Sequence, residues 1–285
     1  MVILGQRLSD GAMAHMMKNY KRVLTIAGSD PSGGAGIQAD LKTFSACGCF
    51  GTSAIVAVVD ENTVGVTGVH PVPLDFVIGQ IKSVLDDIGA DAIKIGMLHS
   101  SELIRGVKET LAKYNITNIV LDPVMVATSG DKLLQDEAIE TLKNDLIPFA
   151  RVITPNILEA EILLERKISE QRDLPVVIRD LSANGRVSVL LKGGHLKEEL
   201  LTDVFYNAET DEIIELSSKR IDTRNTHGTG CTFSSAIAAY LAYGLPLNDA
   251  VRHAKEYMKS AIIAGASYEI GKGHGPVHHF FNFWE

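Results

Sequence analysis

The stretch that decides the fold is RVLTIAGSDPSGGAGIQADLKTFSACG, residues 22–48. It begins with the apolar run RVLTIA and continues into a loop with four glycines in nine residues, Gly28 to Gly36. A continuous apolar run is typical of a strand that is covered on both faces. Glycines permit backbone torsions and close approaches that side chains forbid. The stretch therefore predicts a buried strand that ends in a tightly shaped loop.

The rest of the chain repeats this alternation of short β-rich runs and longer helical patterns. Because strand and helix alternate, we expect a mainly parallel central sheet between two layers of helices, a three-layer α/β/α sandwich. The expected strands are 22–27, 52–59, 91–96, 118–122, 151–155 and 187–193, and the patterns at 74–89, 100–115 and 135–150 have apolar residues at three- and four-residue steps.

The last third of the chain changes character. Two β-like runs, 200–207 and 211–218, are joined by a short turn and predict an antiparallel extension of the sheet. Helical patterns at 229–244 and 246–266 then close the chain. No Pro/Gly/Ser-rich linker divides it, so residues 20–285 are expected to form one domain. Residues 1–19, which include the tag-like GAMAH, are expected to be a tag or a disordered extension, with Met16 or Met17 as the natural start.

Composition limits the classes of partner. The 285 residues are 46% hydrophobic and carry a net charge of −8, without a cluster of lysines or arginines. We therefore expect no nucleic-acid or membrane partner, and no apolar run reaches the length of a membrane span. Cys47, Cys49 and Cys231 cannot form a disulfide framework, which favours reduced thiols and a cytoplasmic location.

In open parallel sheets, ligands bind beyond the carboxyl ends of the strands, so the loops that follow the strands are the candidate site. The first loop matches neither a phosphate-binding P-loop nor the dinucleotide fingerprint, because its glycines are spaced G-x4-G-G-x-G. Asp30 and Asp40 flank it and offer acceptors to a polar heterocycle or a sugar. The alternative is a flexible turn without a ligand.

Acidic residues follow two further strands. Asp60 and Glu61 stand at the exit of the second strand, where they are either solvated turn residues or part of a site. Asp122 follows the fourth strand and is a candidate acceptor on the metal or phosphate side. The segment ATSGD, residues 127–131, has the composition of a mobile flap that excludes water.

Two later loops carry groups suited to phosphate. Asn156 and Glu159 lie three apart at the start of a helical pattern, which places them on one face. They either cap the helix or position hydrated Mg²⁺ on nucleotide phosphates. Lys192 stands beside two glycines at a strand end and can reach phosphate oxygens as a point charge.

The segment NTHGTGC, residues 225–231, leads directly into a helix of small residues. Backbone N–H groups and the macrodipole at a helix start attract negative charge, so this segment is a candidate site for a transferring phosphoryl group. Cys231 stands at the mouth of the helix, whose N-terminus can lower the pKa of a thiol. It is either a thiolate base for an acceptor hydroxyl or an inert buried thiol.

Taken together, the motifs resemble one family. GSDPSGGAG, KIGML, LDPVM, TPN, LKGGH, NTHGTGC and GKGHGPVHHF occur in the same order as in the hydroxymethylpyrimidine and phosphomethylpyrimidine kinases of thiamine biosynthesis, members of the ribokinase-like superfamily. The resemblance implies that MgATP phosphorylates 4-amino-5-hydroxymethyl-2-methylpyrimidine and then its monophosphate. It also implies a homodimer.

The resemblance assigns roles to individual residues. Gly28, Ala35, Asp40, Glu61, Met97 and Val124 would line the pyrimidine pocket, with Glu61 reading the ring nitrogen and the amino group. Asn156, Lys192, Thr226 and Thr229 would contact the nucleotide, and Glu159 and Asp122 would hold Mg²⁺. Gly228 and Gly230 would form the anion hole beside Cys231, which occupies the position of the catalytic aspartate of sugar kinases.

The flap departs from the family pattern. Relatives often have AKSGD, where this chain has Thr128 in place of the lysine, and relatives that also act on pyridoxal often carry a cysteine where this chain has Ala127. Ala127 argues against pyridoxal kinase activity, and a pyridoxal or pyridoxine kinase is kept as the alternative function. A regulator that binds the pyrimidine without catalysis is a third, which the pair Asn156 and Glu159 argues against.

Overall fold

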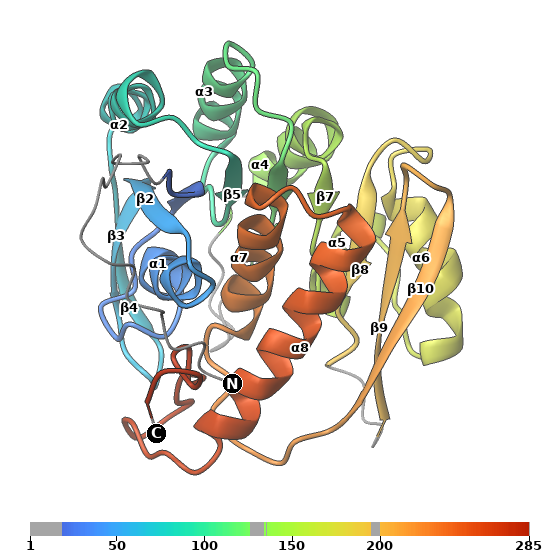
Figure 1. Ribbon diagram of the computed structural model, residues 1–285. Helices are drawn as coiled ribbons and strands as arrows, with labels where there is room; N and C mark the ends of the chain where they lie inside the picture. The colour runs from blue at the N-terminus through green and yellow to red at the C-terminus, as the bar shows by residue number, and fades with distance from the viewer. Residues whose placement is uncertain (1–18, 126–133, 135, 195–199, 285) are drawn as a thin grey trace, which may run out of the picture.

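A mixed sheet of eight strands forms the centre of the computed structural model, which describes residues 19–125, 134, 136–194 and 200–284 (Figure 1). The strand order is β10-β9-β8-β7-β6-β5-β1-β2. Neighbours from β2 to β8 are parallel, and β9 is antiparallel to both β8 and β10. The strands are β1 (Arg22–Ala27), β2 (Phe50–Ile55), β5 (Ala92–Ile95), β6 (Ile119–Leu121), β7 (Val152–Ile153), β8 (Ser188–Leu191), β9 (Leu200–Asn207) and β10 (Glu212–Lys219).

Helices cover both faces of this sheet, which confirms the predicted three-layer sandwich. One face carries α1 (Gly36–Ala46), α7 (Thr229–Ala242) and α8 (Leu247–Gly265). The other carries α2 (Leu74–Asp87), α3 (Ser101–Leu111), α4 (Asp136–Thr141), α5 (Ile157–Leu164) and α6 (Leu174–Leu181). The predicted helix at 135–150 is broken, because after α4 it continues as a π-helical turn (Leu142–Leu146) and a 3₁₀ turn (Ile147–Phe149).

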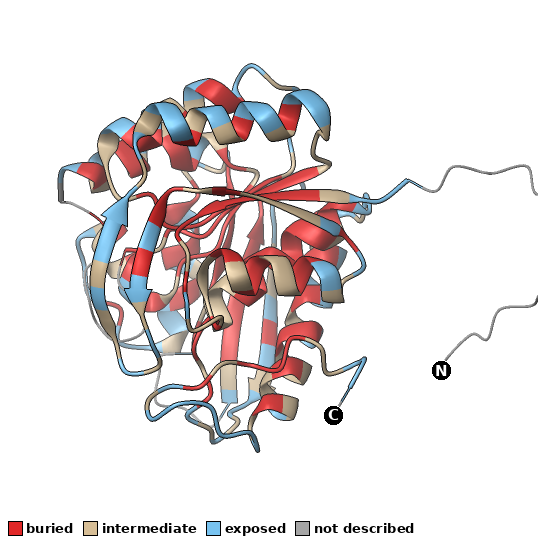
Figure 2. Ribbon diagram, turned by 90° about the vertical axis from the view of Figure 1, so that its left-hand side faces the viewer, coloured by how far each residue is buried: buried red, intermediate tan, exposed pale blue. Residues whose placement is uncertain are grey.

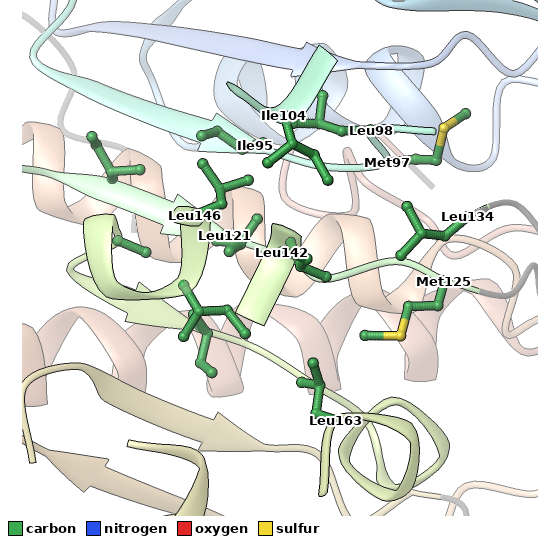
Figure 3. Packing of buried hydrophobic residues seen from close by; sticks show 14 of the residues in the cluster. Ile95, Met97, Leu98, Ile104, Leu121, Met125, Leu134, Leu142, Leu146 and Leu163 are labelled. Atoms are coloured by element: carbon green, nitrogen blue, oxygen red, sulfur yellow. The ribbon is translucent and has the colours of Figure 1, made fainter. Parts of the chain in front are cut away.

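The apolar strand runs explain why both faces are covered. Alternate side chains point to opposite faces of a strand, so Val23 and Ala92 pack under α7 and α8, whereas Leu24 and Ile93 pack under α2 and α3. Figure 2 shows the result as a band of buried strands between helices whose outer faces are exposed. Figure 3 shows the core on the α2–α6 side.

The predicted strand at 52–59 is wrong in one respect. The chain leaves the main sheet after Ile55, and β3 (Ala57–Glu61) pairs antiparallel with β4 (Val66–Pro71) in a separate two-stranded sheet. On β3, buried and exposed residues alternate, so only one of its faces is covered. The apolar run hides this change of partner. Its consequence is that Glu61 ends a small sheet beside the main one.

The C-terminal segment packs beside α7 and α8. The backbone N–H of His227 donates to the carbonyl oxygen of Gly275 over 3.0 Å, and that of His278 donates to Ala261. The ring Nε2 of His279 lies 3.0 Å from Oγ1 of Thr232 on α7.

Among the described residues, no helix combines the length and the apolar character needed to cross a membrane.

His279 makes the stability of the fold depend on pH. Burial lowers its pKa to about 3, and the positive charge of Lys42 adds to this effect, whereas a histidine in the unfolded chain has a pKa of about 6.5. Because the folded value is the lower one, the unfolded state binds more protons in this window. The stability that neutral His279 contributes is complete above about pH 6.5 and is lost as the pH falls towards about 3.

We expect His279→Gln to flatten the acid limb of the stability curve. Urea unfolding at several pH values between about 4.5 and 7 should give a slope of unfolding free energy that is lower than that of the wild type by up to about 1.4 kcal/mol per pH unit. His274 is exposed, so His274→Gln should keep the wild-type slope. An unchanged slope for His279→Gln would contradict this role of the buried ring.

Candidate active site

A cavity of about 670 Å³ opens at the carboxyl ends of the parallel strands. Its walls come from the loops after β1, β5, β6, β7 and β8, from the end of β3, from the first turn of α7 and from α8. The predicted site residues that line it are Gly28, Ala35, Glu61, Met97, Asp122, Val124, Asn156, Glu159, Lys192, Thr226, Gly228, Thr229, Gly230 and Cys231. The structure thus brings together residues that are 203 positions apart at the extremes, from Gly28 to Cys231.

The first turn of α7 is pressed against the glycine-rich loop. Gly228 is the N-cap of α7 and has a φ of +75°, and a Cβ atom there would lie 1.8 Å from the carbonyl oxygen of Gly34. Only glycine fits this conformation and this contact. The free N–H groups of the first turn therefore lie at the cavity wall, where they and the macrodipole favour an anion.

An ion pair stands next to this helix start. Nζ of Lys192 lies 2.9 Å from Oδ1 of Asp122, which also accepts a hydrogen bond from Thr154 over 3.0 Å. Burial opposes the charge on Asp122, but Lys192, Lys94 and the hydrogen bond from Thr154 together hold the pKa of the carboxyl below its usual range. A Cβ atom on Gly230 would lie 3.1 Å from Nζ of Lys192, so the ion pair and the helix start share one end of the cavity.

Asn156 and Glu159 form a capping box at the start of α5. The backbone N–H of Glu159 donates to Oδ1 of Asn156 over 2.9 Å, and the N–H of Asn156 donates to Oε2 of Glu159 over 2.8 Å. The two residues therefore cap the helix, which was one of the two roles expected from the sequence. Both also line the cavity. Burial raises the pKa of Glu159 to about 7, an effect that Lys192 opposes and Asp122 increases.

The carboxylates of Asp122 and Glu159 suit a Mg²⁺ ion. Both are buried at the wall of the cavity, and both offer the oxygen donors that Mg²⁺ prefers. Burial is the main cause of the raised pKa of Glu159, and the neighbouring carboxylate of Asp122 adds to it. A hard cation at this place would favour the ionised form of Glu159.

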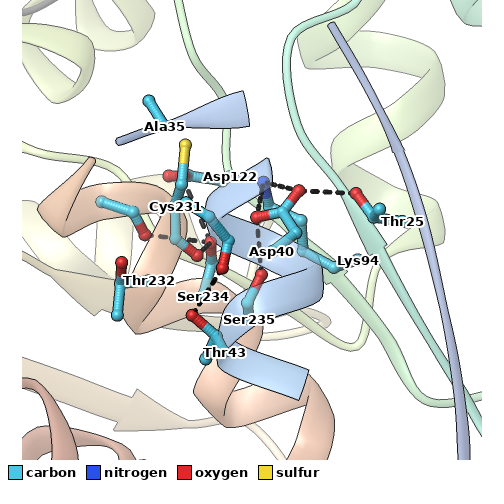
Figure 4. Close-up of polar contacts among 12 residues, drawn as sticks. Thr25, Ala35, Asp40, Thr43, Lys94, Asp122, Cys231, Thr232, Ser234 and Ser235 are labelled. Carbon is cyan, nitrogen blue, oxygen red and sulfur yellow. Dashed lines mark hydrogen bonds and ion pairs between the residues drawn. The ribbon is translucent and has the colours of Figure 1, made fainter. Parts of the chain in front are cut away.

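Asp40 lies behind the cavity wall, which corrects the prediction that it contacts a ligand. Its carboxylate is fully buried, with both oxygens 2.9 Å from Nζ of Lys94 (Figure 4). It also accepts hydrogen bonds from Thr25 over 2.6 Å and from Ser235 over 2.7 Å. Asp40 does not line the cavity itself, but its ion-pair partner Lys94 does.

Lys94 lines the cavity, although no motif in the sequence indicated it. It lies on β5 and is fully buried. Burial disfavours its charge, but Asp40 and the nearby Asp122 and Cys231 together raise the pKa of the lysine above its ordinary value. The available signal was a lone lysine within the apolar strand AIKI.

The structure reverses the expected pKa of Cys231. Burial raises the pKa of this thiol to about 12, although the Lys94 ammonium group acts in the opposite direction. With this pKa the Cys231 thiol is neutral at pH 7, so the helix start does not keep it ionised. The side chain extends towards Ala35 in the glycine-rich loop (Figure 4).

The far end of the cavity carries residues that the sequence did not indicate. Lys255 and Lys259 of α8 line it, together with the apolar side chains of Met258 and Ile262. Nζ of Lys255 is held 2.7 Å from Oδ2 of Asp203 on β9. Positive and apolar groups alternate here on one helix face, which suits a nucleotide that lies along α8.

Comparison with known proteins identifies the family to which the chain belongs. A family model described as phosphomethylpyrimidine kinase matches residues 30–278. The chain belongs to this family. It is therefore a kinase of this type, and kinases of this family use ATP.

Relatives agree with this assignment. A protein from Rhizobium meliloti (strain 1021) named hydroxymethylpyrimidine/phosphomethylpyrimidine kinase is 47% identical over 263 residues, 92% of this chain and 98% of that protein. The crystal structure of phosphomethylpyrimidine kinase from Clostridium difficile 630 is 45% identical, with a TM-score of 0.74 over 85% of this chain and 99% of that one. An ADP complex of Bacillus subtilis pyridoxal kinase is 38% identical, with a TM-score of 0.84 over 92% of this chain and 98% of that one.

Members of the family thus share one scaffold with a vitamin B6 kinase. The flap residues Ala127 and Thr128, which bear on this distinction, lie outside the described residues, as does almost all of the segment 1–19.

Proposed function

We propose that the chain uses MgATP to phosphorylate 4-amino-5-hydroxymethyl-2-methylpyrimidine to its monophosphate, and the monophosphate to the pyrophosphate, in thiamine biosynthesis. The observation that carries this proposal is the first turn of α7, which stands at the wall of one cavity between Glu61 on one side and Lys192 on the other. An acceptor that binds near Glu61 and a nucleotide that binds along α8 would meet at this anion-binding turn.

The pyrimidine end combines apolar walls with one carboxylate. Met97, Val124 and Ala35 line the cavity here and suit the two faces of a flat ring. Met97 belongs to the hydrophobic core as well, so its position is fixed by packing (Figure 3). The carboxylate of Glu61 would accept a hydrogen bond from the amino group of the pyrimidine.

The phosphate end would bind ATP through charge and backbone donors. Thr226 and Thr229 flank Gly228 at the helix start, and Lys192 supplies a cation beside Gly230. Asn156 lies at the start of α5, close enough to the cavity to meet the phosphates. When bound by Glu159 and Asp122, Mg²⁺ supplies charge neutralisation for the phosphate oxygens.

Cys231 would accept the proton of the acceptor hydroxyl. Its Sγ lies at the cavity wall beside the anion hole formed by Gly228 and Gly230. Lys94 lowers the pKa that burial raises, so this buried ammonium group makes the thiolate more accessible. The main catalytic contribution would come from positioning and from stabilising charge on the transferring phosphoryl group.

A direct comparison of two acceptors tests the proposal. Initial rates of ADP formation are measured with the pyrimidine and with pyridoxal under the same conditions, because a pyridoxal kinase has a closely similar structure. We expect a kcat/KM for the pyrimidine that exceeds the value for pyridoxal by at least roughly tenfold, about 1.4 kcal/mol of preferential transition-state binding. Phosphorylation of pyridoxal alone would refute the proposed substrate.

The expected homodimer and cytoplasmic location stay proposals. The thiols of Cys47, Cys49 and Cys231 are free, which suits a reducing compartment. Exposed valines on β3 and β4 offer an apolar face for a second copy of the chain.

A further inference from the structure

His227 lies at the point where three parts of the cavity meet. It is buried in the segment that leads into α7, immediately before the N-cap Gly228. Its ring Nε2 lies 2.8 Å from Oδ2 of Asp30 in the loop after β1, and 4.0 Å from Oε1 of Glu61 at the end of β3. All three residues line the cavity.

Asp30 is a fixed anchor for this ring. Its carboxylate accepts hydrogen bonds from the backbone N–H groups of Ser32, Gly34 and Ala35, over 2.7, 3.0 and 2.6 Å. Burial opposes its charge, but the hydrogen bonds from His227 and Ser32 hold its pKa well below the usual range. A charged Asp30 in turn favours the protonated imidazole.

The ring of His227 is also held in place by packing. A Cβ atom on Gly34 would lie 2.4 Å from its Cδ2, so the glycine-rich loop covers one side of the ring without a gap. Its backbone N–H donates to Gly275 in the C-terminal segment. The contact with the loop and the hydrogen bond to Asp30 fix the ring, with Nε2 directed at Asp30 and 4.0 Å from Oε1 of Glu61.

A metal ion is the competing explanation for this cluster, since the ligand atoms of Asp30, Glu61 and His227 lie within 4.8 Å of one another. Tetrahedral ligands at zinc distances of about 2.0 Å would stand about 3.3 Å apart. The 2.8 Å between Nε2 and Oδ2 is instead an ordinary hydrogen-bond distance. The geometry thus favours a proton between these atoms.

We propose that His227 is a positioning residue for substrate recognition: its imidazolium ring, hydrogen-bonded to Asp30, attracts and orients the Glu61 carboxylate at a point immediately before the N-cap of α7. The proposal rests on the proposed role of Glu61 in binding the pyrimidine. A hydrogen bond to Asp30 and a charge facing Glu61 are separable functions, because glutamine can supply the first without the second.

The decisive experiment is a double-mutant cycle on binding. Calorimetry gives the Kd of 4-amino-5-hydroxymethyl-2-methylpyrimidine for the wild type, His227→Gln, Glu61→Gln and the double variant, and kinetics give the KM for ATP. We expect His227→Gln to raise the Kd roughly tenfold and to change the KM for ATP by less than about threefold. In the Glu61→Gln background, the second substitution should change the Kd by less than about twofold.

Controls separate the possible failures. His274→Gln, an exposed histidine in the C-terminal segment, should bind the pyrimidine like the wild type. His227→Asn is the second variant if glutamine is too long for the space beside Gly34. Independent, multiplicative effects of the His227 and Glu61 substitutions on the Kd would overturn the positioning role of His227 alone. Stoichiometric zinc that is lost in His227→Gln would also overturn it. Wild-type binding by Glu61→Gln would overturn both the role of Glu61 and that of His227, while phosphorylation of the pyrimidine would still stand.

Discussion

Replacing Cys231 with alanine should lower kcat for the pyrimidine by roughly 10²- to 10⁴-fold, the range for loss of a general base, with a much smaller change in KM. The physical reason is that Cys231 lines the cavity in the first turn of α7, where the proposed function places the acceptor hydroxyl. Because burial raises its pKa to about 12, the thiolate fraction at pH 7 is small. Below that pKa the fraction rises about tenfold per pH unit.

The pH profile distinguishes a base from a packing residue. If the thiolate accepts the proton, wild-type kcat should rise with pH between about 7 and 9.5, and the rise should disappear in Cys231→Ala. Cys231→Asp places at this position the residue that sugar kinases use, so it should restore turnover and flatten the profile over the same window. Wild-type turnover by the alanine variant would remove the base and leave the anion hole as the main catalyst.

Replacing Lys94 with methionine should destabilise the fold by about 3–5 kcal/mol, because it leaves the charge of Asp40 buried without its partner. Both side chains are fully buried, and the hydroxyl groups of Thr25 and Ser235 would be the remaining hydrogen-bond partners of the carboxylate. Urea unfolding at pH 7 measures the loss. Turnover should fall as well, since Lys94 lowers the pKa of the Cys231 thiol.

Two further variants test the cause of this destabilisation. Lys94→Met combined with Asp40→Asn removes the uncompensated charge, so it should recover about 1–3 kcal/mol relative to Lys94→Met. Lys143 pairs with Glu140 and Glu165 at the surface, so Lys143→Met should cost less than about 1 kcal/mol. An equal loss for Lys94→Met and Lys143→Met would contradict the importance of the buried pair.

The spacing of apolar residues predicted most of the fold, because the helices have apolar residues at three- and four-residue steps whereas the strands are continuous apolar runs. Runs such as RVLTIA have no alternation, and the strand is indeed covered on both faces. The same property concealed the exchange of sheets after Ile55, since an apolar run does not reveal which strand its backbone will pair with. Partner choice is decided by tertiary hydrogen bonds, such as that from Val72 to Val56.

Residues that line the cavity could be selected from the sequence where one motif supplies one group to a loop. The sequence did not reveal contacts that depend on burial or on a distant partner. Asp40 has a helical position near the glycine-rich loop, yet its direction inward to Lys94 follows only from packing. The pKa of Cys231 was expected to be lowered by a helix start, but burial dominates over that local effect. His227 gains its partners, Asp30 and Glu61, only through folding.

We propose that one cavity transfers the γ-phosphoryl group of ATP first to the hydroxyl and then to the phosphate of the pyrimidine. Mass analysis of products over time, with limiting pyrimidine and excess MgATP, tests it most directly. We expect the monophosphate to appear first and to be converted into the pyrophosphate, with both steps slowed in Cys231→Ala. ATP consumption that leaves the pyrimidine unmodified would contradict the account.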